Sequence, residues 1–232
     1  MKKYLHIQQE AYEANMKLPA LGLVIFTFGN VSAADRSLGV FAIKPSGVEY
    51  PQLTPEQMTI VDFDGKPVEG ALRPSSDTLT HAVLYREWKE INGIAHTHST
   101  YATAWAQAQR DIPIYGTTHA DHTTENIPCA APMSDEMIAG NYEYETGFQI
   151  VRCLAQRKLR HTEMEMILVG NHAPFTWGAS ADKAVYNSGA LEAIAKMAFL
   201  TEQINSQSPL LKASIRKKHF ERKHGPGAYY GQ

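Results

Sequence analysis

Apolar and polar residues follow two different periods along the chain, and this predicts a protein of mixed helices and strands. Apolar positions recur at helical spacing in several long segments, and short apolar runs bounded by turn residues are typical of strands. The spacing predicts helices over residues 2–17, 77–89, 100–109, 134–157 and 181–204. Short apolar runs predict strands over residues 23–28, 40–43, 58–63, 67–69, 91–97 and 164–169.

Turn and capping residues predict where these elements begin and end. Pro19 is expected to stop the first helix, and Ser180 is a suitable N-cap for the last long one. Residues 29–39 read as a polar turn, and residues 110–133 as an irregular segment with three prolines. Strands and helices are mixed without a strict βαβ repeat. We therefore expect an α/β fold in which a central, mostly antiparallel sheet is covered by helices.

Composition favours one domain over residues 1–232. The 232 residues are 44% hydrophobic and 20% charged with a net charge of −2, which is enough apolar material for one sizeable core. The balanced charge argues against a nucleic-acid partner. The longest apolar stretch, residues 21–26, is far too short to span a membrane. The distant cysteines Cys129 and Cys153 form no disulfide framework, so we expect a cytoplasmic protein.

The histidines supply the most informative chemistry. His96 and His98 are two residues apart on a predicted strand, so their imidazoles point to the same face and can chelate one divalent cation. His172, in the turn after the next predicted strand, is a candidate third ligand, and Asp77 can supply an oxygen. Three histidines and a carboxylate are typical of catalytic zinc sites. By residue type alone, His119 and His122 are alternative ligands, and Asp77 is equally well read as a plain helix N-cap.

Three turn segments offer donors to an anion. Residues 28–32, 44–47 and 74–77 each carry small hydroxyl or amide groups, and the last of these begins a predicted helix, where the helix dipole favours an anion. Each segment taken alone is equally well read as a routine turn or cap. Neither a dinucleotide-binding fingerprint, nor a P-loop, nor the elbow motif of serine hydrolases occurs in the sequence.

The C-terminal residues 206–232 form a basic tail that ends in two tyrosines. Between residues 212 and 224 there are six Lys or Arg and one acidic residue, a pattern typical of a solvated helix face. The final stretch, AYYGQ, is either a disordered end or an arm that packs on another subunit, and its aromatic residues favour the arm.

Taken together, these motifs resemble the L-ribulose-5-phosphate 4-epimerases, a branch of the class II (zinc) aldolase/epimerase family. The resemblance spans nearly the whole chain and rests on TFGNVSA, IKPSGV, PSSDT, HTHS, GTTHAD, NYEYETG, NHAPFTWG, RKHG and AYYGQ. It implies a mixed α/β domain with a central antiparallel sheet. It also implies a fourfold-symmetric homotetramer whose active sites lie between subunits, with arm 206–232 at the interface.

The resemblance assigns roles to individual residues. It implies that the zinc ligands are His96, His98 and His172, with Asp77 as a weaker fourth ligand. It implies that the substrate is held by Gly29, Asn30, Lys44, Ser46, Gly47, Ser75, Ser76 and His219. Asp121 and Tyr230 match the acid/base pair, Tyr230 coming from a neighbouring chain. Asn171, Ala173 and residues 122–126 depart from the family pattern, which bears on substrate fit more than on the class of reaction.

The implied reaction is the interconversion of L-ribulose 5-phosphate and D-xylulose 5-phosphate, a step of L-arabinose catabolism. The C4 proton is not adjacent to the C2 carbonyl, so we expect cleavage of C3–C4, rotation of the aldehyde and re-addition. Zinc acts as the Lewis acid, and two acid/base groups serve the two faces. The alternatives are an epimerase for L-xylulose 5-phosphate, an aldolase acting on a sugar such as fuculose phosphate, and a non-catalytic relative of the adducin head.

Overall fold

An eight-stranded sheet organises the computed structural model, which describes residues 3–230. Residue 2 of the first predicted helix and residues 231–232 of the predicted arm lie outside the described part. The strand order is β4-β3-β2-β1-β5-β8-β7-β6, and every pairing is antiparallel except that of β6 with β7. The strands are β1 (Asn30–Asp35), β2 (Val40–Ile43), β3 (Thr59–Asp62), β4 (Pro67–Glu69), β5 (Gly93–His96), β6 (Cys129–Ala130), β7 (Met166–Val169) and β8 (Pro174–Gly178). The predicted fold class is confirmed.

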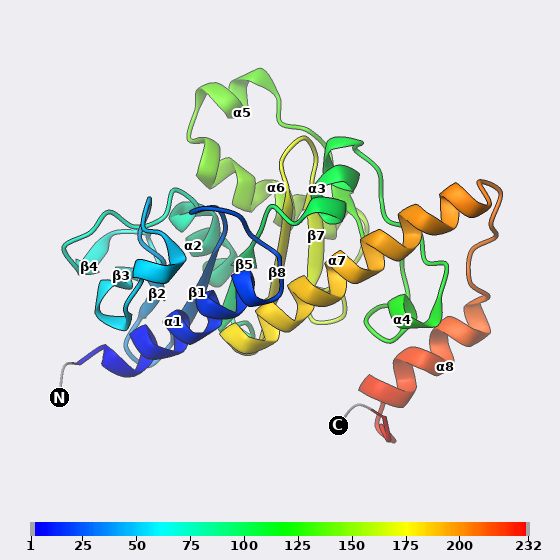
Figure 1. The fold of residues 1–232 in the computed structure, drawn as a ribbon, viewed down its shortest axis with the longest axis horizontal. Helices are drawn as coiled ribbons and strands as arrows, with labels where there is room; N and C mark the ends of the chain where they lie inside the picture. Colours follow the sequence, from blue (N-terminus) through cyan, green and yellow to red (C-terminus); the bar gives the residue numbers. More distant parts are fainter. Residues whose placement is uncertain (1–2, 231–232) are drawn as a thin grey trace.

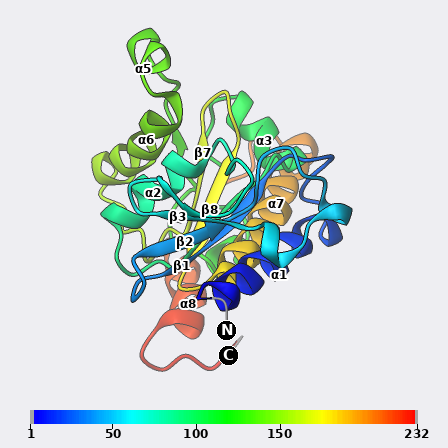
Figure 2. The ribbon, with the colours of Figure 1, turned by 90° about the vertical axis from the view of Figure 1, so that its left-hand side faces the viewer.

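Helices cover both faces of this sheet. They are α1 (Leu5–Ala20), α2 (Thr78–Glu87), α3 (Thr100–Gln107), α4 (Thr117–Ala120), α5 (Asp135–Ala139), α6 (Tyr142–Gln156), α7 (Ala181–Ile204) and α8 (Ala213–His224), with short 3-10 turns at Tyr50–Gln52 and Pro55–Gln57. Helices α1, α3 and α7 lie on one face, while α2 and α6 pack together on the other (Figures 1 and 2). Across residues 3–230, none of the helices combines the length and the apolar character that a membrane crossing requires.

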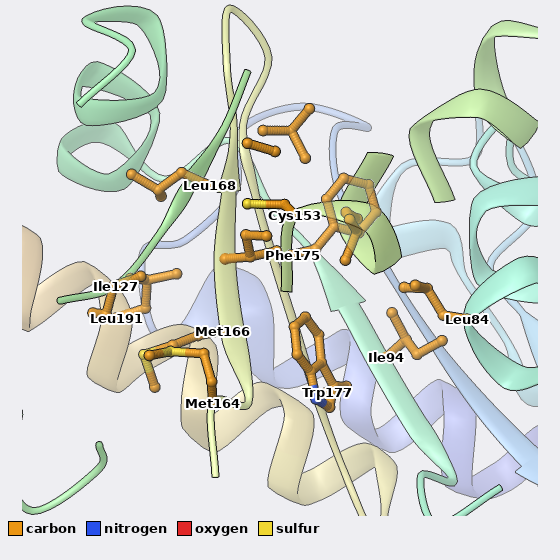
Figure 3. Close-up of a cluster of buried hydrophobic side chains, with 14 of the residues drawn as sticks. Leu84, Ile94, Ile127, Cys153, Met164, Met166, Leu168, Phe175, Trp177 and Leu191 are labelled. Carbon is orange, nitrogen blue, oxygen red and sulfur yellow. The ribbon is translucent and has the colours of Figure 1, made fainter. Parts of the chain in front are cut away.

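Apolar side chains from the sheet and both helical layers form the core. Figure 3 shows Trp177 and Phe175 of β8 beside Ile94 of β5 and Leu84 of α2. The first residue of β5, Gly93, lies so close to the start of α7 that a Cβ would meet the carbonyl oxygen of Ser180 at 2.2 Å. The close approach of α7 to the middle of the sheet therefore requires glycine at this position.

The predicted strand at residues 23–28 is wrong, and so is the predicted turn that follows it. Residues 21–29 form a loop that exposes Ile25 and Phe26, and the sheet begins at Asn30. The strand β1 carries Asn30 and Ser32 as buried polar residues. Hydrophobic patterning failed here because Ile25, Phe26 and Phe28 are exposed although they are apolar, whereas the polar side chains of Asn30 and Ser32 in the observed strand are buried.

Three further boundaries differ from the prediction. The helix expected over residues 134–157 is two helices, which separate at Gly140 (φ −83°, ψ −133°). Pro19 does not stop α1 at residue 17 but lies inside its last turn, where the missing N–H removes one helical hydrogen bond and the helix ends one residue later. The segment that begins at Pro174, expected as part of a turn, is β8, since proline is tolerated as the first residue of a strand.

Candidate active site

Three histidines converge at one end of the central strands. His96 is the last residue of β5, His98 follows it by two residues, and His172 lies in the turn between β7 and β8. The pairing of β5 with β8 sets His96 opposite Phe175 and so brings this turn to the end of β5. One ligand atom from each imidazole lies within 4.8 Å of the others, and the Nε2 atoms of His96 and His98 are 3.2 Å apart.

The surroundings of the three rings keep them neutral. His96 Nδ1 donates to the carbonyl oxygen of Pro174 (3.0 Å), which leaves the lone pair of Nε2 facing the other two rings. Burial, followed by the charge of His98, lowers the pKa of His96 to about 3, and burial lowers the pKa of His172 to about 4. Burial also lowers the pKa of His98. Neutral imidazoles are the form that binds a metal ion.

Asp77 adds a carboxylate to this cluster. It occupies the N-cap position of α2, as one interpretation of the sequence expected, but its side chain makes no cap hydrogen bond. Asn30 Nδ2 donates instead to Asp77 Oδ2 (2.6 Å) and to Ser75 Oγ (3.1 Å). Oδ2 of Asp77 lies 4.0 Å from His96 Nε2. Strand β1 therefore orients the carboxylate toward the imidazoles.

This donor set fits a divalent metal. Three neutral imidazoles and one carboxylate are the ligand types of catalytic zinc centres. Nδ1 of His172 is buried and has no hydrogen-bond partner among residues 3–230, which is costly unless another group satisfies it. His119 and His122 lie elsewhere: His119 Nε2 bonds to the carbonyl oxygen of Glu125, and His122 packs on Tyr186.

A pocket of about 250 Å³ opens beside the histidines. Two backbone hydrogen bonds, from Ser46 N to Arg73 O (2.9 Å) and from Ser75 N to Lys44 O (3.0 Å), join the loop after β2 to the segment before α2. The lining residues are Thr27, Phe28, Gly29, Asn30, Lys44, Pro45, Ser46, Gly47, Ser75, Ser76, Asp77, His96, His98 and His172. All three anion-binding segments expected from the sequence thus meet the candidate metal ligands in one pocket.

Lys44 is the cation of this pocket. Its ammonium group is buried and donates only to the carbonyl oxygens of Thr27 (3.3 Å) and Pro45 (3.5 Å) among the residues that the structure describes. It also lies 5.0 Å from the centre of the Tyr50 ring. Burial lowers the pKa of Lys44 to about 8, so the group is still mostly charged at neutral pH. A buried cation paired with no carboxylate in the described chain favours an anionic ligand.

Gly29 forms the wall between Lys44 and the histidines. It has a φ of +75°, and a Cβ would meet the carbonyl oxygen of His96 at 2.9 Å and the side chain of Val24 at 2.6 Å. Any side chain here would therefore be strained both by the positive φ and by collision with its neighbours. The hydroxyl of Tyr50 donates to the carbonyl oxygens of Phe28 and Gly29, both at 3.0 Å, which fixes this loop at the pocket edge.

The remaining predicted site residues form a second cluster. His219 Nδ1 lies 3.0 Å from Asp121 Oδ1, and α8 packs against α4 at the end of the molecule seen at the lower right of Figure 1. The guanidinium of Arg222 lies over the ring of Tyr230, 4.1 Å from its centre. None of these four residues lines the histidine pocket. A single chain therefore brings together the candidate metal ligands and the three candidate anion-binding segments, and holds the candidate acid/base pair apart from them.

Some residues around the site carried no recognisable signal in the sequence. His81 on α2 is fully buried and contacts Ser32 Oγ through Nδ1 (2.7 Å). Phe175 stacks on His96 with ring centres 4.2 Å apart, and Arg222 bonds to Asp121. Only the topology brings these partners together, since each pair comes from distant parts of the sequence.

Solved structures of other proteins share this fold. An L-fuculose 1-phosphate aldolase superimposes with a TM-score of 0.77 at 22% identity, over 94% of this chain and 95% of that one. YgbL from Escherichia coli superimposes with a TM-score of 0.74 at 23% identity, over 94% of this chain and 100% of that one. An L-fuculose 1-phosphate aldolase from Glaciozyma antarctica PI12 gives 0.75 at 18% identity over 95% and 82%. At these identities the likeness concerns the fold.

A family model identifies the chain more directly. It matches residues 9–199, which include the three histidines, Asp77 and every residue that lines the pocket. The match therefore covers most of the chain and the whole histidine pocket, and stops before α8. This chain belongs to the family of the class II aldolase and adducin N-terminal domain.

Proposed function

We propose that this protein is a zinc-dependent, cytoplasmic epimerase that interconverts L-ribulose 5-phosphate and D-xylulose 5-phosphate. One observation carries the proposal: a neutral triad of imidazoles and the buried ammonium of Lys44 line the same pocket. The first suits a metal that binds sugar oxygens, and the second suits a phosphate. The class II aldolase family supplies the class of chemistry, which is reversible cleavage of a carbon–carbon bond next to a carbinol.

His96, His98 and His172 would hold the metal, with Asp77 beside them. Bound there, zinc supplies a Lewis acid that lowers the energy of negative charge developing on the substrate oxygens. Asn30 keeps the carboxylate of Asp77 aimed at this position through its 2.6 Å hydrogen bond. The carbonyl of Pro174 fixes the tautomer of His96, which keeps Nε2 available as a ligand.

The phosphate would lie at the other end of the pocket. Lys44, Ser46, Ser75 and Ser76 offer one ammonium and three hydroxyl groups there, and Gly29 and Gly47 allow close approach to the backbone. Cleavage of C3–C4 produces an aldehyde that carries the phosphate. Holding that phosphate lets the aldehyde rotate without escaping, and this is what separates an epimerase from an aldolase.

Two proton-transfer groups are needed on opposite faces of C4. We assign them to Asp121 and Tyr230: one removes the proton from the C4 hydroxyl, and the other protonates the new alkoxide. Neither residue lines the pocket of its own chain, so the proposal requires that assembly bring both groups to the substrate, with Tyr230 supplied by a neighbouring copy. A homotetramer with shared active sites, in which arm 206–232 lies at the interface, meets this requirement. His219, bonded to Asp121, would assist with the substrate.

The test is conversion of L-ribulose 5-phosphate to D-xylulose 5-phosphate, measured before and after chelation and again after zinc is restored. We expect turnover that is lost with chelator and recovered with zinc. Turnover that survives complete metal removal would refute the metal role. L-xylulose 5-phosphate, assayed in parallel, decides between the two epimerase specificities.

The second candidate function is cleavage by an aldolase of the fuculose-phosphate type. The specific observation in its favour is the close structural likeness to two L-fuculose 1-phosphate aldolases. An aldolase releases dihydroxyacetone phosphate and a free aldehyde, whereas the epimerase releases neither. A non-catalytic role like that of the adducin head is disfavoured by the intact set of three imidazoles, and a zinc-binding assay decides that case.

A further inference from the structure

Asn15 holds one residue of β1 in the way a neighbouring strand would. It is fully buried on α1. Its Oδ1 accepts a hydrogen bond from the N–H of Val31 (2.9 Å), and its Nδ2 donates to the carbonyl oxygens of Val31 and Ala11, both at 2.8 Å. A single side-chain amide therefore satisfies both peptide groups of Val31.

The partner that Asn15 replaces is Lys44. Strands β1 and β2 pair from Asp35 with Val40 to Ser32 with Ile43, so the next pair in register would be Val31 with Lys44. The N–H of Ala34 bonds to Asn92 on the β5 side, and since peptide groups alternate along a strand, those of Val31 face β2. The carbonyl of Lys44 instead accepts from Ser75 N (3.0 Å).

This exchange of partners separates the two strands where the pocket begins. Gly29 and Asn30 precede Val31 along one wall, and Lys44, Pro45 and Ser46 continue β2 along the other. Continued pairing of β1 with β2 would bring these walls to the spacing of adjacent strands, about 5 Å. A phosphate needs more room than that spacing leaves between two backbones.

We propose that Asn15 is a positioning residue that keeps β1 and β2 apart and so sets the width of the phosphate end of the pocket. It touches no substrate and acts through the backbone of Val31, next to Asn30. The inference rests on the proposed function in one respect, which is that the pocket accepts a phosphate group. It predicts that loss of the Asn15 amide weakens phosphate binding and leaves the metal ligands in place.

The experiment compares Asn15→Leu with Gln8→Met in the full-length protein. Gln8 is a matched control because it is a buried amide on the same helix and donates to the carbonyl oxygen of Met58 (2.9 Å), away from the pocket. Binding of inorganic phosphate to the zinc-loaded protein is measured by calorimetry, together with zinc stoichiometry and KM and kcat for the sugar phosphate. In Asn15→Leu we expect about tenfold weaker phosphate binding or more, with full zinc content.

Each outcome decides a separate question. If Asn15→Leu binds phosphate as Gln8→Met does, the inference is overturned while the proposed function stands. If the wild type binds zinc but neither phosphate nor sugar phosphate, both fail. Should Asn15→Leu not fold, Asn15→Asp replaces it, because a carboxylate keeps the acceptor for Val31 N and lacks the donor for Val31 O. Hydrogen exchange in the wild type needs no variant: a Val31 amide that exchanges as fast as the exposed loop 21–28 also overturns the inference.

Discussion

Arg222 binds both oxygens of the Asp121 carboxylate, with Nε 3.1 Å from Oδ1 and Nη2 2.9 Å from Oδ2. Such a two-point contact fixes the orientation of a carboxylate as well as its charge. Burial alone would raise the pKa of Asp121, but the hydrogen bonds from Arg222 and His219 outweigh it and hold the pKa below its usual range. The contact thereby ties α8 to the loop after α4 and keeps Asp121 ionised.

Replacing Arg222 should change the pH dependence of turnover. In Arg222→Gln the carboxylate of Asp121 loses its largest stabilising hydrogen bond, so its pKa rises. If ionised Asp121 is one of the proton-transfer groups, activity disappears as pH falls through that pKa, and the acid limb of the rate profile moves to higher pH. The measurement is kcat/KM against pH for the variant and the wild type, and an unmoved acid limb would exclude Asp121 as the titrating group.

Removal of one imidazole should abolish metal binding. In His96→Asn we expect zinc affinity to fall by at least about a hundredfold and turnover to disappear with it, because the ring that links the other two is lost. His6→Asn is the control, since His6 is exposed and contacts only Asp35 among its hydrogen-bond partners in the described chain. Metal analysis of the two purified variants checks this prediction, and a zinc-free His96→Asn protein with full activity would contradict it.

Tyr230→Phe should lower kcat by about a hundredfold or more without loss of zinc, because in the proposed mechanism it removes a proton-transfer group and no ligand. Co-expression with His96→Asn then tests whether sites are shared between chains. In randomly mixed oligomers, about a quarter of the sites combine an intact His96 of one chain with an intact Tyr230 of its neighbour. About a quarter of wild-type activity should therefore return. Mixed oligomers that remain inactive would place both residues in the site of the same chain.

Acid should destabilise the protein through His81. Burial lowers the pKa of His81 to about 3; the charge of Asp77 opposes this shift, and His96 adds a smaller lowering. Below its ordinary value of about 6.5, the unfolded chain binds a proton that the folded chain does not, so the free energy of unfolding falls as pH falls. The free energy of unfolding is measured with urea in the presence of chelator. Between about pH 6.5 and about pH 5, it should fall by about 2 kcal/mol less in His81→Gln than in the wild type. Equal losses would mean that His81 is already protonated in the fold.

The sequence predicted most of the helices, since α2, α3 and α7 bury apolar faces at helical spacing. The N-cap at Ser180 is confirmed, with its hydroxyl accepting from Lys183 N (3.2 Å). The sequence-based prediction failed where polar residues are buried and apolar residues are exposed. Strand β1 buries Asn30 beside Asp77 and Ser32 beside His81. Its sequence is therefore as polar as that of a surface turn, which is why a turn was predicted.

The sequence predicted which residues meet in the histidine pocket. It did not predict that Asp121, His219 and Tyr230 form a separate cluster. His96 and His98 have a spacing that an extended segment converts into a chelating pair, although only His96 lies within β5, and the structure brings His172 to them. Sequence spacing carries no information on the contact of Arg222 with Asp121, 101 residues apart, or on the distance of that pair from the pocket. Those relationships depend on where α8 docks, which local patterns do not determine.

The order of strands in the sheet has a consequence for how the protein is made. Strand β5 is inserted between β1 and β8, with Asn30 opposite His96 on one side and Phe175 opposite His96 on the other. The three imidazoles can therefore converge only after residues near 175 have left the ribosome and closed the sheet. A nascent chain that stalls before that point holds His96 and His98 without their third partner, so capture of metal by all three imidazoles must wait until the residues of β8 have been made.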